Sequence, residues 1–217
     1  MRILATADFH GNRLAFERVA AKAEHCEVEL MIVCGDITHF GSLEQAKDLL
    51  SIIGTSDAFF VPGNCDPPDL GEERVGKMES IHGKCRRFGE IAFLGAGGSS
   101  PSPFDTPFEL TEVGIARILE VSLASCPNET EMVLVSHSPP AGTKVDVAST
   151  GEHVGSLSIR KFIENSKPKL VVCGHIHEAR GMDKINGSYV VNPGPAGRGH
   201  CALVDVDHDV KVEFDML

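Results

Sequence analysis

The segment from Leu170 to His177, with the sequence LVVCGHIH, constrains this chain more than any other. Its four leading apolar residues predict a strand that is buried on both faces of a sheet. Gly174 interrupts this strand, and His175 and His177 follow it. Ligands of open α/β sheets bind at the carboxyl ends of the strands, which is where these imidazoles would lie. Taken alone, the segment fits two solvated loop histidines equally well.

Four further apolar runs, at 2–6, 30–34, 58–61 and 131–135, also end in residues that can bind a metal. These residues are Asp8 with His10, Asp36, Asn64 and His137. Each has a simpler explanation, because an aspartate after a strand often caps the next helix and Asn64 after a glycine can hold a left-handed turn. Five such strand ends in one chain would be a large coincidence, so we expect a metal site.

The candidate ligands are two carboxylates, one amide and four imidazoles. This mixture suits manganese, iron, zinc or nickel, and the lack of thiolate ligands argues against a structural zinc site. Seven ligands are too many for one tetrahedral ion and suit two adjacent ions that share a carboxylate. Two ions about 3.5–4 Å apart are the usual arrangement for hydrolysing phosphoesters.

The charge of the chain limits its partners. Lys and Arg number 20 against 31 Asp and Glu, which gives a net charge of −11 without a block of like charge. We therefore expect neither a nucleic-acid partner held by a basic face nor an anionic membrane surface. An anionic substrate would need local positive charge, which bound metal ions can supply.

Targeting signals and cysteines predict a location. No apolar run approaches the roughly 18 residues of a membrane span, and no signal-peptide core is present at the N-terminus. The seven cysteines are scattered without a Cys-x-x-Cys motif, and Cys34 and Cys173 lie in apolar runs. We expect a cytoplasmic protein with reduced thiols.

The pattern of elements predicts one α/β domain over residues 1–217. Strands at 2–6, 30–34 and 58–61 alternate with helices at 14–23 and 42–53, the second capped by Ser42, which predicts a parallel sheet. A half with antiparallel strands follows. Its expected elements are a hairpin of 80–87 with 90–94, a helix at 109–125, the strand at 131–135, a helix from Ser156 or Ser158 to Glu164, the strand after Lys169, and strands at 188–191, 201–206 and 210–214.

The order and position of the candidate ligands resemble the calcineurin-like metallophosphoesterases over essentially the whole chain. The resemblance is carried by Asp8-x-His10, Gly35-Asp36, Gly63-Asn64-x-Asp66, His137 and Gly174-His175-x-His177. It implies a four-layer α/β/β/α sandwich of two mixed sheets. Asp8, His10 and His177 would hold one metal, Asn64, His137 and His175 the other, and Asp36 would bridge both. Manganese is the favoured metal.

Three further segments are similar to the small Icc-related members of this family. They are Gly95-x-Gly97-Gly98, the stretch from Pro103-Phe104 to Pro107-Phe108, and the run from Gly151 to Gly155. Asn192-Pro193-Gly194 also fits that branch, although it can equally be a simple turn.

Residue 65 departs from the family pattern. Most members carry a histidine after the asparagine ligand, where it is thought to protonate the leaving group or contact the phosphate, and here the residue is Cys65. A neutral thiol is a weak donor, and a thiolate would repel a phosphate. Asp66, which orients that histidine in the family, loses its usual partner. We therefore expect a preference for diesters or for good leaving groups.

The resemblance implies a phosphoesterase in which a hydroxide that bridges two metals attacks a phosphodiester or a small phosphomonoester. The residues expected to act in catalysis are Asp36, Asn64, Cys65, Asp66 and His137, and the candidate phosphate contacts are His39, His153, Arg180 and Arg198. His137 or His39 would stabilise the charge that develops.

Two other functions belong to the same fold. The alternative is a metal-bound scaffold for protein interactions with little catalysis, although every ligand position here is filled. The net charge argues against a nuclease. The sequence leaves the substrate and a homo-oligomeric state open.

Overall fold

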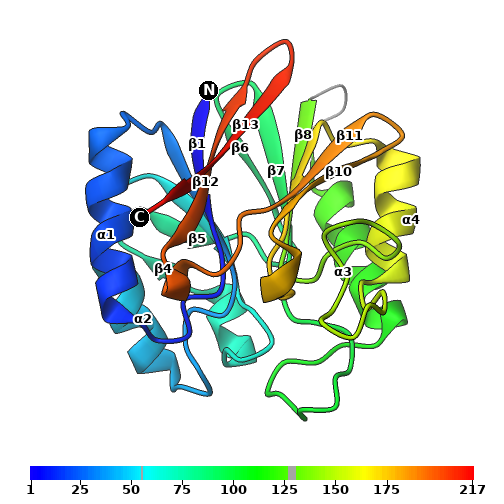
Figure 1. The fold of residues 1–217 in the computed structure, drawn as a ribbon, viewed down its shortest axis with the longest axis horizontal. Helices are drawn as coiled ribbons and strands as arrows, with labels where there is room; N and C mark the ends of the chain where they lie inside the picture. The colour runs from blue at the N-terminus through cyan, green and yellow to red at the C-terminus, as the bar shows by residue number, and fades with distance from the viewer. Residues whose placement is uncertain (55, 127–130) are drawn as a thin grey trace.

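Two mixed β-sheets face each other, and helices cover the outer face of each (Figure 1). A computed structural model describes residues 1–54, 56–126 and 131–217. The first sheet has the strand order β13-β12-β1-β2-β3-β5-β4. Its strands are β1 (Arg2–Thr6), β2 (Leu30–Cys34), β3 (Ala58–Val61), β4 (Arg74–Val75), β5 (Met78–Ser80), β12 (His200–Val206) and β13 (Val210–Met216). The central strands β1, β2, β3 and β5 are parallel, and antiparallel strands form both edges.

The second sheet has the order β10-β11-β9-β8-β7-β6. Its strands are β6 (Cys85–Phe88), β7 (Ile91–Ala96), β8 (Glu131–Ser136), β9 (Leu170–Val172), β10 (Gly181–Ile185) and β11 (Ser188–Asn192). Four of them are parallel, and β6 and β10 lie antiparallel at the edges. The second half of the chain therefore contains more parallel pairing than the sequence predicts.

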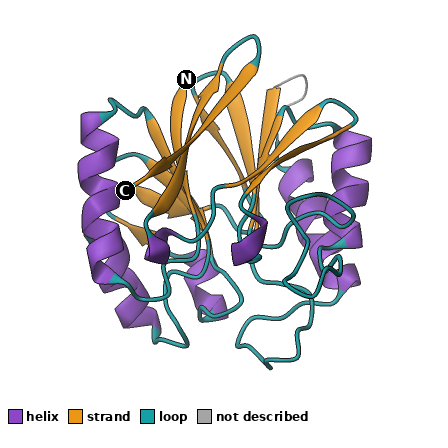
Figure 2. Ribbon diagram, in the orientation of Figure 1, coloured by secondary structure: helices purple, strands orange, loops and turns teal. Residues whose placement is uncertain are grey.

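Each long helix begins at a polar cap and packs against one sheet. The helices are α1 (Arg13–His25) and α2 (Leu43–Ser51) on the first sheet, and α3 (Glu112–Ala124) and α4 (Leu157–Ser166) on the second (Figure 2). Asn12, Ser42, Thr111 and Ser156 each accept a hydrogen bond from the backbone N–H three residues on. The expected cap at Ser42 is confirmed, and Ser156 is the cap of the last helix. Three short 3₁₀ helices are η1 (Pro68–Glu72), η2 (His177–Ala179) and η3 (Ala196–Arg198).

Buried side chains form three cores, which makes the architecture the expected four-layer α/β/β/α sandwich. In β1, Ile3 and Ala5 face the other sheet, whereas Leu4 faces the helices, and β2 alternates in the same way. Both faces of these strands are covered, so the strands are apolar at every position. The layer between the sheets draws on β1, β2 and β3 and also on β7, β8 and β9.

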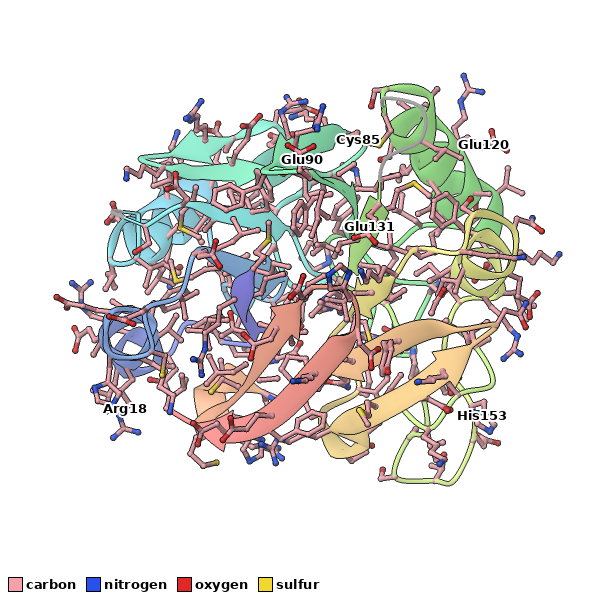
Figure 3. The ribbon with its side chains drawn as sticks, turned by 90° about the horizontal axis from the view of Figure 1, so that it is seen from above. Arg18, Cys85, Glu90, Glu120, Glu131 and His153 are labelled. Carbon is pink, nitrogen blue, oxygen red and sulfur yellow. A yellow bond between two sulfur atoms is a disulfide. The ribbon has the colours of Figure 1, made fainter. Side chains whose placement is uncertain are left out.

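Two cysteines correct the expectation of reduced thiols. Cys85 at the start of β6 and Cys126 after α3 form a disulfide with a Cα–Cα distance of 5.3 Å (Figure 3). They are 41 residues apart in the sequence, and they meet because α3 packs on the sheet beside β7. The other five cysteines are free thiols. Across the described ranges, no helix has the length and apolar content needed to cross a bilayer.

Candidate metal centre

The candidate ligands follow strands of both sheets and meet at the carboxyl ends of β1, β2, β3, β8 and β9, which point toward the lower half of Figure 1. Asp8, His10, Asp36 and His175 have positive φ angles of 56°, 48°, 50° and 70°. Residues other than glycine rarely adopt a positive φ, and those that do are concentrated at functional sites. The backbone therefore turns sharply after each strand and directs the side chain into the centre.

Glycines in the motifs allow the ligand loops to approach closely. A Cβ on Gly63 would lie 2.1 Å from Oδ1 of Asp36, and one on Gly35 would lie 2.6 Å from Nδ1 of His137. A Cβ on Gly174 would lie 2.9 Å from Oδ2 of Asp8. Glycine is required at these positions because a side chain would collide with the candidate ligands, and not only because the loops turn there.

The first group of donor atoms contains Asp8, His10 and His177, whose ligand atoms lie within 4.8 Å of one another. Nε2 of His10 is 3.0 Å from Nε2 of His177. Nε2 of His177 is also 3.7 Å from Oδ1 of Asp8. Two ring nitrogens and a carboxylate oxygen thus lie close enough together to contact a single cation.

The second group is centred on His137. Its Nδ1 lies 2.7 Å from the carbonyl oxygen of Cys34, which can only accept, so Nδ1 carries the proton and donates. Nε2 is then the ring nitrogen that is left to contact a metal, and it lies 2.8 Å from Oδ1 of Asn64. Two facing acceptors repel unless a proton or a cation lies between them. The ring of His175 is 5.1 Å from that of His137.

Asp36 lies between the two groups. Its Oδ2 is 3.6 Å from Nε2 of His10, and its Oδ1 is 3.4 Å from Nε2 of His137. Each oxygen therefore faces a different group, as expected for a carboxylate that bridges two ions.

Electrostatics favour occupation by cations. Asp8 and Asp36 are buried together. Burial raises the pKa of Asp36, and the charge of Asp8 adds to this effect. Burial also favours the neutral form of Asp8, but the neighbouring imidazoles of His177, His137 and His10 together outweigh burial and lower that pKa. Burial lowers the pKa of His10 to about 4 and that of His175 to about 3. Both rings are therefore neutral at pH 7, which is the form that binds metals. The donor set fits two divalent cations.

Asp66 connects two ligand loops and does not contact a ligand directly. Its carboxylate accepts hydrogen bonds from the backbone N–H groups of Ile37, Thr38 and Gly63 and from the hydroxyl of Thr38. These partners replace the histidine that the family pattern would supply. Asp66 is therefore a positioning residue that fixes the loop after β2 against the loop after β3.

Cys65 is buried beside the carboxylate of Asp36. Its backbone N–H donates to Oδ1 of Asp36 at 2.9 Å, and its side chain lines the pocket above the ligands. Burial and the charge of Asp36 raise the pKa of the thiol, so it is neutral at pH 7. The chain therefore has a neutral thiol at this position, where most of the family has an imidazole.

The candidate phosphate contacts fall into two pairs. His39 lines a pocket of about 270 Å³ with His10 and His175, and Arg198 lines an adjoining pocket with His10 and His177. Neither His153 nor Arg180 lines these pockets, and both have other partners.

His153 lies on the outer rim of the molecule (Figure 3), with its Nδ1 2.7 Å from Oδ1 of Asp146. Arg180 donates to the carbonyl groups of Pro193 and Asp215 and packs over the ring of Phe214. The structure therefore gives no geometric support to these two as phosphate contacts.

Sequence reasoning did not assign a role to three residues of the pocket that His39 lines: Phe40, Phe104 and Thr106. Phe40 directly follows His39, and Phe104 lies in a loop rich in proline and serine. A large aromatic residue in such a polar loop is the signal that would have identified Phe104.

A model of the calcineurin-like phosphoesterase superfamily domain matches residues 1–209. The chain belongs to this family. Calcineurin-like phosphoesterases are metal-dependent hydrolases that bind divalent metals, and this structure contains candidate metal-ligand groups such as Asp8 with His10 and His177. A curated relative, the uncharacterized protein MJ1162 of Methanocaldococcus jannaschii, is 38% identical over 200 residues, which cover 90% of this chain and 88% of the relative.

Solved structures of several phosphoesterases share this fold. The protein TT1561 of Thermus thermophilus has a TM-score of 0.78 at 18% identity, with 99% of this chain and 98% of that chain covered. A dimetal phosphatase from Danio rerio has a TM-score of 0.68 at 12% identity, with 100% and 96% covered. A novel archaeal phosphodiesterase has a TM-score of 0.56 at 15% identity, with both chains covered fully. At these identities the likeness concerns the fold.

Proposed function

We propose that this calcineurin-like phosphoesterase uses two divalent metal ions to hydrolyse phosphodiesters in preference to phosphomonoesters, with manganese as the favoured metal. The observation that carries the proposal is the position of Asp36, whose two oxygens face imidazoles of different donor groups at 3.6 and 3.4 Å. When bound, such a pair of ions supplies Lewis acidity and a hydroxide nucleophile at neutral pH.

The residues of the chain prepare the site for that chemistry. Asp8, His10 and His177 would hold one ion, Asn64, His137 and His175 the other, and Asp36 both. The carbonyl of Cys34 fixes the His137 ring so that Nε2 faces the centre. The hydrogen bonds of Asp66 keep two of the ligand loops in register.

Two side chains beside the ligands would act on the phosphoryl group. His39 is exposed and lines the pocket that contains Phe40 and Phe104, and Arg198 is exposed at the adjoining pocket. Both can donate hydrogen bonds to phosphoryl oxygens, and Arg198 adds positive charge to an otherwise acidic protein. Their placement on either side of His10 and His177 would orient the ester for in-line attack.

Cys65 supports the preference for diesters. It occupies the position beside Asn64 from which a histidine could protonate a leaving group, and a thiol is a weak donor. A phosphodiester carries less charge than a monoester, so it depends less on an additional cationic donor at this point.

Hydrolysis of two chromogenic esters tests the proposal. Metal-free protein is reloaded separately with Mn²⁺, Ni²⁺, Zn²⁺ or Mg²⁺ and assayed with bis(p-nitrophenyl) phosphate and p-nitrophenyl phosphate. We expect metal-dependent cleavage with a higher kcat/KM for the diester, and a loss of roughly 100-fold or more in Asp36→Asn. If protein with a full metal complement cleaves neither ester, the enzymatic role is wrong and a binding scaffold of the same fold becomes the better account.

A further inference from the structure

Two phenylalanines at the metal centre are exposed to solvent. All eleven phenylalanines of the chain lie in the described ranges, and only Phe40 and Phe104 among them are largely exposed, at 51% and 77%. Both line the same pocket of about 270 Å³ whose other walls include His10, Asp36 and His175. Exposed apolar side chains that gather at a functional pocket indicate a binding surface.

Phe40 ends a series of aromatic rings that begins at the metal ligands. The ring of His39 lies edge-on to that of His10 at 5.4 Å and edge-on to that of Phe40 at 4.8 Å. The backbone of Phe40 has a φ of 59°, and its N–H donates to the carbonyl of Cys65 at 3.1 Å. This strained conformation holds an aromatic ring outward beside the ligands, where the hydrophobic effect alone would not place it.

Phe104 lies on an ordered loop that is joined to a ligand loop. The N–H of Phe108 donates to the carbonyl of Asn64 at 3.0 Å. Within the loop, Oε1 of Glu109 accepts hydrogen bonds from the backbone N–H and the hydroxyl of both Ser102 and Thr106. The loop is the green segment at the lower edge of Figure 1. This loop places the ring of Phe104 at the pocket, where the ring is exposed and does not pack in the core.

The pocket suits an uncharged, flat group. Among its described lining residues there is no lysine or arginine, whereas Arg198 lines the adjoining pocket on the other side of His10 and His177. The phosphate charge would therefore be met by metals and by Arg198, and the phenylalanines would meet another part of the substrate. A volume near the lower end of ligand pockets, ~300–1,000 Å³, favours one ring system over a polymer.

We propose that Phe40 and Phe104 form a subsite for a planar aromatic group, either a nucleobase or an aryl ring, that is attached to the phosphoester. The inference rests on the proposed function, which places the phosphate at the metal ligands. Stacking on such rings depends on a π-face and not on base identity, so the subsite selects aromatic esters as a class and does not read sequence.

Inhibition by three phosphates tests the subsite. Thymidine 5′-monophosphate, phenyl phosphate and methyl phosphate are compared as competitive inhibitors of bis(p-nitrophenyl) phosphate cleavage. In the parent we expect both aromatic phosphates to bind more tightly than methyl phosphate. Phe104→Ala should weaken the aromatic inhibitors about tenfold and leave methyl phosphate within about twofold. Phe104→Tyr should restore the preference, and Val113→Ala, at an exposed residue of α3, should behave as the parent.

A second readout does not depend on turnover. The chain has no tryptophan, so Phe104→Trp introduces a single tryptophan whose fluorescence can be followed. In metal-loaded protein we expect quenching by thymidine 5′-monophosphate or phenyl phosphate but not by methyl phosphate, and no response in Val113→Trp. The two aromatic phosphates together show whether a base or any aryl ring suffices.

The two tests separate this inference from the proposed function. Equal effects of all three phosphates, or no effect of any, would overturn the aromatic subsite even if the enzyme is active. If the parent hydrolyses no ester, the proposed function fails, and the fluorescence titration still decides whether an aromatic ring binds at Phe104.

Discussion

At the centre of the site, the carboxylate of Asp36 presents one oxygen to His10 and the other to His137. The carboxylate is almost fully buried and also accepts the backbone N–H of Cys65. These contacts from three loops fix the position of the carboxylate. Preorganisation of this kind lowers the cost of assembling a site that must hold two cations close together.

The side chain at position 65 should limit the range of leaving groups. Cys65→His places a stronger donor beside Asn64, so we predict that it raises kcat/KM for phenyl phosphate, which has a poor leaving group, by roughly tenfold or more. It should change cleavage of p-nitrophenyl phosphate much less, because that leaving group needs little protonation. The measurement is the ratio of the two kcat/KM values in manganese-loaded protein.

Cys65→Ser is the matched control, since it removes the sulfur without adding an imidazole, and its ratio should equal that of the parent. An unchanged ratio in Cys65→His at full metal content would show that residue 65 does not limit the leaving group.

The convergence of the candidate ligands could be predicted from sequence because each lies a few residues after an apolar strand, and parallel strands bring their carboxyl ends to one edge. The contacts of His153 and Arg180 could not be predicted from the sequence. His153 binds Asp146 and Arg180 packs on Phe214 through contacts set by loop and edge-strand conformation. The exposure of Phe40 and Phe104 at the same pocket likewise depends on two loops whose positions sequence patterns do not specify.

Among the elements, the loop between β7 and α3 is held by one carboxylate. Glu109 accepts four hydrogen bonds, two from Ser102 and two from Thr106. The bond from the Ser102 hydroxyl lowers the pKa of Glu109 most, and the other three add to this effect. The pKa is therefore about 2, although partial burial alone would raise it. Because the pKa is lower in the folded state, ionised Glu109 stabilises the loop above its unfolded pKa of about 4.5. This contribution is lost as the pH falls from about 4.5 to 2.

Glu109→Gln should therefore loosen the loop at neutral pH. The substitution keeps an acceptor oxygen but removes the charge, so we predict faster hydrogen exchange of the 99–110 amides and a fall in melting temperature of at most about 4 °C at pH 7. The difference from the parent should shrink as the pH is lowered to 3. Glu120→Gln removes the same charge from an exposed site on α3 and should have no effect on the loop. A difference that is constant with pH would contradict this role of Glu109.

The long elements were easier to predict than the short ones. The four helices and the apolar strands have strong periodicity or caps, and the structure confirms them with small shifts of their ends. Strand β10 was missed, although Asn186-Gly187 with φ angles of 47° and 97° forms the two-residue turn typical of hairpins. Strands β4 and β5 have two and three residues and form only because β3 provides an edge for pairing.

At the scale of the whole molecule, the two sheets supply different ligands to one centre. The first sheet supplies Asp8, His10, Asp36 and Asn64, and the second supplies His137, His175 and His177. The bond between Nδ1 of His137 and the carbonyl of Cys34 crosses from one sheet to the other. The centre therefore forms only when the sheets are packed, and the apolar layer between them determines its geometry. The Cys85–Cys126 disulfide links the start of β6 to the segment after α3. The spacing of the cysteines in the sequence could not reveal this contact between distant segments.

Metal stoichiometry determines whether this site holds two metal ions that share Asp36. Metal-free protein is titrated with Mn²⁺ by calorimetry, and bound metal is measured after gel filtration for the parent, Asp36→Asn and Glu120→Gln, with circular dichroism to verify folding. We predict two ions per chain in the parent and in Glu120→Gln, and at most one in folded Asp36→Asn. One ion or none in the parent, or two ions bound with unchanged affinity in Asp36→Asn, would contradict the shared-carboxylate centre.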